Sequence, residues 1–134
     1  MPERRAPDDP REWLSRARSS LTQAKLRHPE IYLEDLCFNA QQAAEKAIKA
    51  ILISLRVSFP YVHDLAHLVT LVERAGVSVP HEVREAEKLT RFAVFARYPT
   101  VGPAIPESEY QEALASAEAV VEWASRILAE RHTG

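Results

Sequence analysis

Residues 39–49 constrain the fold more than any other part of the chain. They run Asn-Ala-Gln-Gln-Ala-Ala-Glu-Lys-Ala-Ile-Lys, with four alanines and no β-branched residue before Ile48. Alanine has the highest helix propensity of all residues, so this composition strongly favours an α-helix. Alanine side chains also let a neighbouring helix approach closely. The segment therefore predicts a helix at the centre of the fold.

This predicted helix, which spans about residues 30–56, has an apolar side and a polar side. The apolar stripe follows helical spacing and consists of Leu33, Cys37, Ala40, Ala44, Ala47, Ile51 and Leu55. The polar row consists of Asp35, Asn39, Gln42, Lys46 and Lys49, with Gln41 and Glu45 beside it. Glu45 lies one turn before Lys49, so the two can form an ion pair. The polar row is either a solvated helix face or one wall of a binding site.

Helix-start and helix-stop residues place two further helices. Asp9 is a good N-cap, with Pro10 at the first helical position, and a helix from there to about residue 27 ends before His28–Pro29. A short helix begins at Asp64, whose side chain can cap it, and closes at Gly76.

The C-terminal half predicts two more helices. Pro80 opens the first, and a segment with three prolines and a glycine at residues 97–106 follows it as a loop. The last helix begins near residue 107 or 108. It carries an apolar stripe of Tyr110, Ala113, Leu114, Ala117, Val120, Val121, Ala124, Ile127 and Leu128. No segment alternates with the two-residue period of a strand. The predicted fold is all-α, an antiparallel up-and-down bundle of four longer helices and one short helix.

Composition narrows the classes of function. The chain has 134 residues, a length typical of one domain. Its net charge of −2 gives no overall electrostatic attraction to nucleic acid or membranes. We expect a flexible tail over residues 1–8 and a single domain over residues 9–131. The single cysteine, Cys37, lies on the apolar stripe and is expected to be buried and inert. One cysteine and no apolar run of membrane length indicate a cytoplasmic protein, with no membrane association.

Two short motifs contain the candidate functional residues outside the long helix. His63 and Asp64 form either a capping and turn-fixing pair or part of a catalytic site. Arg97 and Tyr98 precede Pro99, and this motif can simply end a helix. Alternatively, Arg97 offers a fork of donors and Tyr98 a stacking face, which suit a phosphate and a base. The chain has neither metal-ligand spacing nor a phosphate-binding glycine loop, so we expect no metal and no cofactor.

Three motifs in this order resemble the HEPN domain family (higher eukaryotes and prokaryotes nucleotide-binding). They are Gln-Gln-Ala-Ala-Glu-Lys-Ala-Ile-Lys-Ala from residue 41, His63-Asp64-Leu65 and Arg97-Tyr98-Pro99, and the resemblance runs from about Trp13 to Leu128. It implies the same helical fold and a homodimer. The wide apolar arc from Leu36 to Leu55, with aromatic residues such as Phe92, Phe95, Trp13 and Trp123, also predicts a homodimer, because one protomer would not bury so much apolar surface. Ribonuclease members of that family resemble one another in an Arg, four to six residues, then His motif. Counted from Arg97, the positions at which this motif would have its histidine are occupied by Gly102, Pro103 and Ala104.

The catalytic residues of those ribonucleases therefore do not carry over, and an enzymatic role is uncertain and disfavoured. An Arg-x6-His string does occur at Arg56 and His63, but it follows the second helix and contains Pro60. The resemblance implies a non-catalytic nucleotide- or RNA-binding or partner subunit. Such a subunit acts with a separate small nucleotidyltransferase, as in toxin–antitoxin pairs. The alternatives are a metal-independent ribonuclease with a non-standard site and a structural helical adaptor.

The candidate ligand-binding residues form one predicted cleft. Arg97 and Tyr98, at the end of the fourth helix, would face the polar edge of the second helix. That edge contributes Gln42, Glu45, Lys46 and Lys49, with His63 and Asp64 nearby. Guanidinium, ammonium and amide groups that converge in this way suit a phosphate-bearing ligand. The alternative is that Arg97 pairs with Glu45 or another carboxylate as a structural tie.

Overall fold

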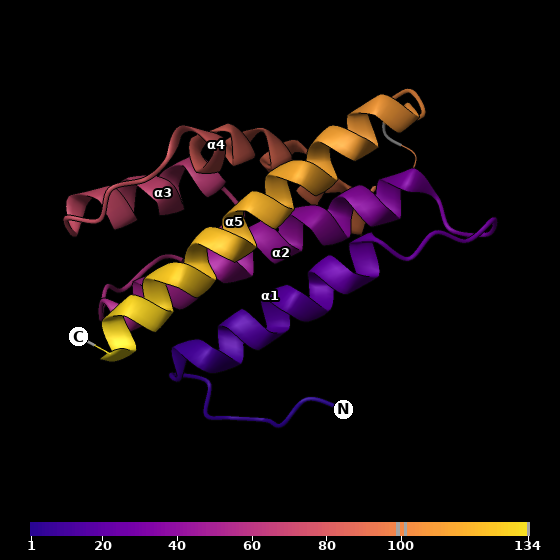
Figure 1. Cartoon of the computed structure of the whole chain (residues 1–134). Helices are drawn as coiled ribbons and strands as arrows, with labels where there is room; N and C mark the ends of the chain where they lie inside the picture. The colour runs from indigo at the N-terminus through magenta and orange to yellow at the C-terminus, as the bar shows by residue number, and fades with distance from the viewer. Residues whose placement is uncertain (99, 101, 134) are drawn as a thin grey trace.

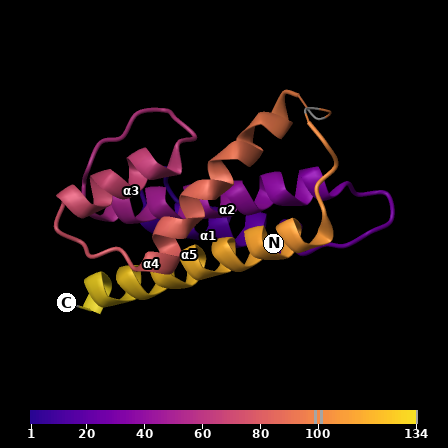
Figure 2. The same ribbon diagram turned by 90° about the horizontal axis from the view of Figure 1, so that it is seen from above.

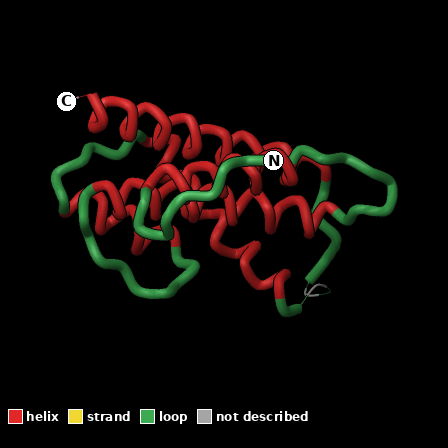
Figure 3. The backbone as a smooth tube through the Cα atoms, turned by 90° about the horizontal axis from the view of Figure 1, so that it is seen from below, coloured by secondary structure: helices red, strands yellow, loops and turns green. Residues whose placement is uncertain are grey.

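A computed structural model describes residues 1–98, 100 and 102–133, and throughout these ranges the regular structure is helical. Figure 3 shows the helices and the loops that join them. The elements are α1 (Pro10–Ala24), α2 (Leu33–Ser54), α3 (Leu65–Arg74), α4 (His81–Arg84), the 3₁₀ helix η1 (Glu85–Ala96) and α5 (Glu107–Thr133). The predicted all-α bundle is confirmed. Pro99 and Val101, in the predicted loop, lie outside the described residues.

Helix α2 is the centre of the bundle, as its alanine content predicts. It packs against α1, α3, η1 and α5 (Figures 1 and 2). The longer segments α1, α2, α4–η1 and α5 alternate in direction. Helix α3 lies beside the C-terminal end of α2. Cys37, Ala40, Ala44, Ala47 and Ile51 have no exposed surface. Small side chains on several faces let these four helices approach one backbone, and they explain why this helix is buried around most of its circumference.

Helix α1 begins as predicted and ends earlier than predicted. The Asp9 carboxylate accepts a hydrogen bond from the backbone N–H of Arg11 at 2.9 Å, so Asp9 is the N-cap. The helix ends at Ala24, before His28–Pro29. The hydroxyl of Tyr110 donates to the Ala24 carbonyl oxygen at 2.6 Å. This bond gives a partner to a carbonyl that the helix end leaves open, and it ties α1 to the start of α5.

Helices α2 and α3 end in the same hydrogen-bonded motif. At the end of α2 the N–H of Arg56 donates to the Ile53 carbonyl and the N–H of Val57 to the Leu52 carbonyl. At the end of α3 the N–H of Gly76 donates to the Glu73 carbonyl and the N–H of Val77 to the Val72 carbonyl. This pattern requires a left-handed residue just past the helix. Arg56 adopts φ 58° and Gly76 φ 93°, and the predicted closure of α3 at Gly76 is confirmed.

The fourth helix differs from the prediction, because only one turn of it is α-helical. The rest is the 12-residue 3₁₀ helix η1. The apolar residues of this segment recur every three positions, at Val83, Ala86, Leu89, Phe92 and Phe95. A helix with three residues per turn keeps such a set on one face, whereas an α-helix would let it drift around the axis. The strict spacing of three therefore favours the tighter helix.

The single chain buries most of its large apolar side chains. Tyr110, Phe92 and Trp123 are each less than 5% exposed, and α5 begins at Glu107 as predicted. Cys37 is fully buried, and burial raises the pKa of its thiol to about 12, so it is inert at neutral pH.

Candidate functional site

A row of buried polar side chains runs along α2. Gln41, Glu45 and Lys49 follow one another at steps of four, and each is at most 4% exposed. The Lys49 ammonium donates to Glu45 Oε2 at 2.9 Å, so the predicted pair is formed. Gln41 donates to Glu45 Oε1 at 2.9 Å, and Gln42 donates to Gln41 at 2.7 Å. A solvated face is therefore the wrong interpretation for Glu45 and Lys49. Every described buried side-chain polar atom has a partner.

His63 reaches this row from the connection between α2 and α3. Its Nδ1 lies 2.8 Å from Glu45 Oε1, while 58% of its side chain is exposed. Burial alone would raise the pKa of Glu45, but hydrogen bonds from His63, Lys49 and Gln41 outweigh burial and lower it. Glu45 is therefore an ionised carboxylate at neutral pH. It holds Nδ1 of the imidazole and directs Nε2 away from itself.

Aromatic rings enclose the Lys49 ammonium. Its nitrogen lies 5.9 Å from the ring centre of Trp13, 5.6 Å from that of Phe59 and 5.4 Å from that of Tyr61. Trp13 and Phe59 also make an edge-to-face contact with each other. Cation–π contacts and the Glu45 carboxylate together stabilise a charge that is almost out of water. Lys49 is thus held between α1 and the residue 57–64 connection.

Lys46 and Asp64 have local structural partners. Lys46 donates to the Ser20 hydroxyl on α1 at 2.9 Å, and burial lowers the pKa of its ammonium. Asp64 accepts from the backbone N–H of Ala66 at 3.1 Å, so the predicted cap of α3 is confirmed. The backbone N–H of the next residue, Leu65, donates to the Thr90 hydroxyl of η1 at 3.1 Å. The first bond ties α2 to α1, and the other two fix the start of α3 and its position against η1.

Arg97 and Tyr98 form a separate exposed end. Arg97 is the C-cap of η1, and 58% of the Tyr98 surface is exposed. Among the described residues, the Arg97 side chain makes no hydrogen bond or ion pair, so the alternative pairing with Glu45 is not formed. Arg91, two turns earlier in η1, pairs with Glu109 at 2.8 Å. No described contact joins Arg97 or Tyr98 to the buried row, and the single cleft that the sequence suggests stays a prediction.

Arg56 and His63 do not share a site. Arg56 lines a hollow at one end of the bundle, and His63 is not among the residues of that hollow. The Arg-x6-His string therefore places its two side chains in different surroundings. Within the described ranges, no three His, Cys, Asp or Glu side chains lie close enough together to hold a metal ion. No helix of that part is both long and apolar enough to cross a membrane.

The sequence did not identify the aromatic enclosure of Lys49. Phe59 and Tyr61 are distant from Lys49 in the chain, and they face it only because the connection after α2 folds back over that helix. Glu45, Lys49 and His63 were all candidates from the sequence. The contact of His63 with Glu45 depends on the path of the connection between α2 and α3, and a helical pattern does not specify that path.

Comparison with known proteins agrees with this architecture. The family model described as HEPN domain matches residues 10–128. The crystal structure of TT1696 from Thermus thermophilus superposes with a TM-score of 0.75 and 30% identity, over 89% of this chain and 98% of that chain. ST0689, described as an archaeal HEPN homologue, superposes with a TM-score of 0.67 and 23% identity, over 92% of this chain and 97% of that chain. None of the curated proteins matches. The chain belongs to the HEPN domain family.

Proposed function

We propose that this HEPN domain protein is a non-catalytic binding subunit for a nucleotide or a short RNA. One observation supports this proposal above others: Arg97 and Tyr98 are exposed side by side, and among the described residues the guanidinium has no partner. A free guanidinium can bind a phosphate through two parallel N–H bonds, and an exposed tyrosine ring can stack on a base. With a net charge of −2, the chain would rely on such local contacts and not on a general positive field.

The proposal includes a separate small nucleotidyltransferase as partner, in a toxin–antitoxin-like pair. The family resemblance suggests this partner, and the chain carries no nucleotidyltransferase motif of its own. The proposal also includes a homodimer. Phe92 and Trp123 are buried within one protomer and give no support for a dimer. Val94 and Tyr98, four residues apart near the end of η1, remain exposed and offer an apolar contact there. Sedimentation that shows only monomer at micromolar concentration would contradict the dimer.

Fluorescence anisotropy with a labelled short RNA, and calorimetry with nucleotides, test the binding function. We expect binding by the unaltered protein and a loss of about tenfold or more in Arg97→Ala, because a charged hydrogen-bonding group is removed. Tyr98→Ala should weaken RNA binding by a similar factor through lost stacking. Arg74→Ala is the control, because Arg74 is also an exposed arginine, in the last turn of α3. Equal affinities in all four proteins, or no binding by any, would refute the proposal.

A second candidate function rests on the Glu45–His63 contact. A carboxylate that orients Nδ1 of an exposed imidazole leaves Nε2 in position to accept a proton, as a general base does. In RNA cleavage, Nε2 would take the proton of the 2′-hydroxyl as that oxygen attacks phosphorus and the 5′-oxygen leaves. Cleavage of RNA in the presence of EDTA, abolished in His63→Ala and in Arg97→Ala, would favour this metal-independent ribonuclease. Binding without any cleavage would leave the binding subunit as the function.

A further inference from the structure

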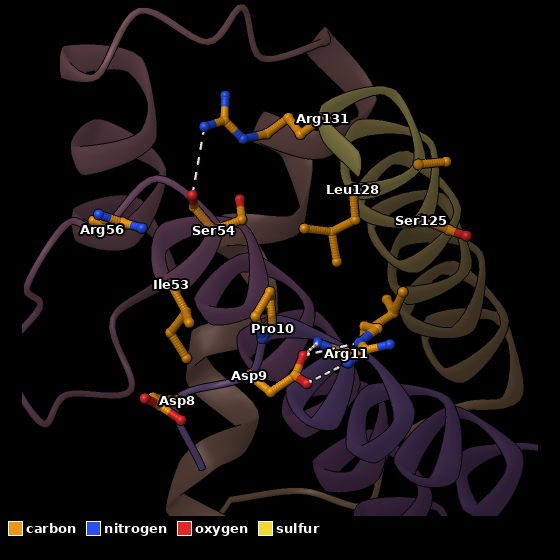
Figure 4. A pocket seen from close by; sticks show the side chains of 12 residues that line it. Asp8, Asp9, Pro10, Arg11, Ile53, Ser54, Arg56, Ser125, Leu128 and Arg131 are labelled. Carbon is orange, nitrogen blue, oxygen red and sulfur yellow. Dashed lines mark hydrogen bonds and ion pairs between the residues drawn. The ribbon is translucent and has the colours of Figure 1, made fainter. Parts of the chain in front are cut away.

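A hollow of about 680 Å³ opens where the start of α1 meets the ends of α2 and α5 (Figure 4). Small-molecule sites in proteins usually have volumes of roughly 300–1,000 Å³, so this hollow is large enough for a metabolite. Its walls include neither Arg97 nor any member of the Glu45 network. The hollow is therefore separate from the surface on which the proposed function rests.

Aliphatic side chains form the inner wall of the hollow. Leu14, Ile53 and Leu128 line it together with Pro10 and Ala129. Figure 4 shows the Leu128 side chain pointing into the space between α2 and α5. Among the described residues that line the hollow, none is aromatic. A wall of this kind favours an aliphatic group over a flat base, because it offers apolar contact without a ring on which to stack.

Two arginines stand on one side of the hollow. Arg56 and Arg131 lie near the end of α2, on the opposite side from Asp9 and Arg11 (Figure 4). Arg11 is bound to the Asp9 carboxylate through two bonds of 3.1 and 2.8 Å. The only hydrogen bond described for the Arg131 side chain is a long one, 3.4 Å, to the Ser54 carbonyl. The Arg56 side chain makes none with the described residues. Two guanidinium groups are thus available to an anion.

The backbone of Arg56 supports a role for its side chain. Arg56 holds φ at 58° in the position that Gly76 occupies at the end of α3. Glycine adopts this conformation without a steric penalty, whereas a residue with a Cβ is strained there. The protein therefore keeps a strained arginine where the same helix-ending motif elsewhere uses glycine. Strain of this kind is common where a side chain has a functional task.

We propose that this hollow binds a small organic anion with an aliphatic body. Arg56 and Arg131 bind the carboxylate or phosphate group, and the aliphatic part packs against Leu14, Ile53 and Leu128. Burial of the aliphatic part supplies most of the affinity, and the two guanidinium groups supply the selectivity for an anion. The Asp9–Arg11 pair closes the opposite rim without competing for the ligand, and the Asp8 carboxylate also lines the hollow, so the anionic group binds at the Arg56 and Arg131 side.

Titration of octanoate into ¹⁵N-labelled protein, followed by NMR, tests the proposal. We expect shifts at the start of α1 and the ends of α2 and α5. Acetate, which lacks the aliphatic body, and 1-octanol, which lacks the charge, should each bind about tenfold or more weakly. Arg56→Ala and Arg131→Ala should each weaken octanoate binding by about tenfold or more. Arg74→Ala removes an exposed arginine outside the hollow and should change nothing.

Arg56→Gly separates lost binding from lost folding. This variant removes the guanidinium and the strain together, so it should bind octanoate as weakly as Arg56→Ala while melting at a higher temperature than the unaltered protein. Octanoate affinity unchanged in both arginine variants would overturn the proposal, as would equal affinities for octanoate and 1-octanol. If AMP shifts the same backbone amide signals and binds more tightly than octanoate, the proposal that the ligand has an aliphatic body would be overturned.

Discussion

His63 Nδ1 lies 2.8 Å from Glu45 Oε1, although 18 positions separate the two residues in the sequence. Glu45 also accepts bonds from Lys49 and Gln41, so one carboxylate joins the central helix to the connection that follows it. That connection supplies Phe59 and Tyr61, whose rings face Lys49. Glu45 therefore helps to hold this connection against the central helix, directly through His63 and indirectly through Lys49.

Removal of the Glu45 carboxylate should destabilise the protein strongly. Glu45→Ala leaves the Lys49 ammonium, 4% exposed, without its counter-ion. Breaking a buried ion pair on one side costs about 3–5 kcal/mol, so the free energy of unfolding should fall by about that amount. Urea denaturation of the variant and the unaltered protein measures this difference.

Glu122→Ala is the matched control for Glu45→Ala. Glu122 also pairs with a basic residue four positions on, Arg126, at 3.2 Å, but that pair is exposed. An exposed pair on a helix is worth about 0.3–0.5 kcal/mol, so this variant should unfold almost like the unaltered protein. A similar loss in both variants would mean that Lys49 is well hydrated. Replacing Lys49 by Met in the Glu45→Ala background should recover part of the loss, because the unpaired charge is removed.

The Glu45 carboxylate should also make stability depend on pH in the acidic range. Its pKa in the folded protein is lowered below the ordinary value of about 4.5, so the unfolded chain takes up a proton at a higher pH than the folded one. The carboxylate therefore stabilises the fold fully above about pH 4.5, and this contribution is lost as pH falls through the folded pKa.

Comparison with Glu45→Gln isolates that contribution from the other carboxyl groups. Glu107 titrates in the same range, with a pKa lowered to about 2 by its hydrogen bonds with Arg27 and Gln111, but it is present in both proteins. The difference in unfolding free energy between the unaltered protein and Glu45→Gln should be largest near neutral pH. It should shrink as pH falls below about 4.5. A difference that stays constant from pH 7 to pH 3 would show that Glu45 titrates normally.

The sequence was sufficient for the parts of the fold that depend on local chemistry. Caps at Asp9 and Asp64, the left-handed closure at Gly76 and the apolar stripe of α5 all appear where the residue types demand them. The 3₁₀ geometry of η1 was not predicted, although the spacing of three that favours it is present in the sequence. Over a single turn, an apolar spacing of three fits both an α-helix and a 3₁₀ helix. Only a run of such spacings over several turns distinguishes the two.

The sequence predicted which residues belong to the candidate site, but not their burial. Glu45, Lys49 and His63 were selected, yet the burial of the first two was not foreseen, because lysine and glutamate are mostly exposed residues. Burial here depends on the chain after α2 returning over that helix, and this path is set by packing and not by local preference. The same limit applies to the hollow, which three helix ends distant in sequence create together.

The tight packing around α2 can be tested by a change in volume. Ala44 has no exposed surface, so Ala44→Leu forces extra atoms between helices and should cost about 1–3 kcal/mol. Lys46→Ala removes a bond to the Ser20 hydroxyl from a partly exposed side chain and should cost about 0.5–1.5 kcal/mol. Thermal melts of the two variants compare them directly. Equal midpoints would mean that Ala44 does not face a closely packed neighbour.

Arg56 and Gly76 allow the cost of a left-handed backbone to be measured in both directions within one protein. Each is the second residue beyond its helix, directly after the C-cap residue, and closes the same pair of backbone hydrogen bonds. Arg56→Gly removes a steric penalty of about 1–2 kcal/mol, partly offset by the greater freedom that glycine gives the unfolded chain, so a net gain of about 0.5–1 kcal/mol is expected. Gly76→Ala introduces the penalty at φ 93°, where an added Cβ meets no atom within 4 Å, and should cost about 1–2 kcal/mol.

Because the surroundings of Gly76 are open, any loss in Gly76→Ala comes from the backbone and not from a clash. Arg56→Ala is the reference for the first site, since it keeps the strained Cβ and removes only the guanidinium. Denaturant unfolding should therefore order the proteins as Arg56→Gly above the unaltered protein, Arg56→Ala close to it and Gly76→Ala below it. If Arg56→Gly were less stable than Arg56→Ala, the arginine backbone would carry no strain, and the functional argument built on Arg56 would lose its structural support.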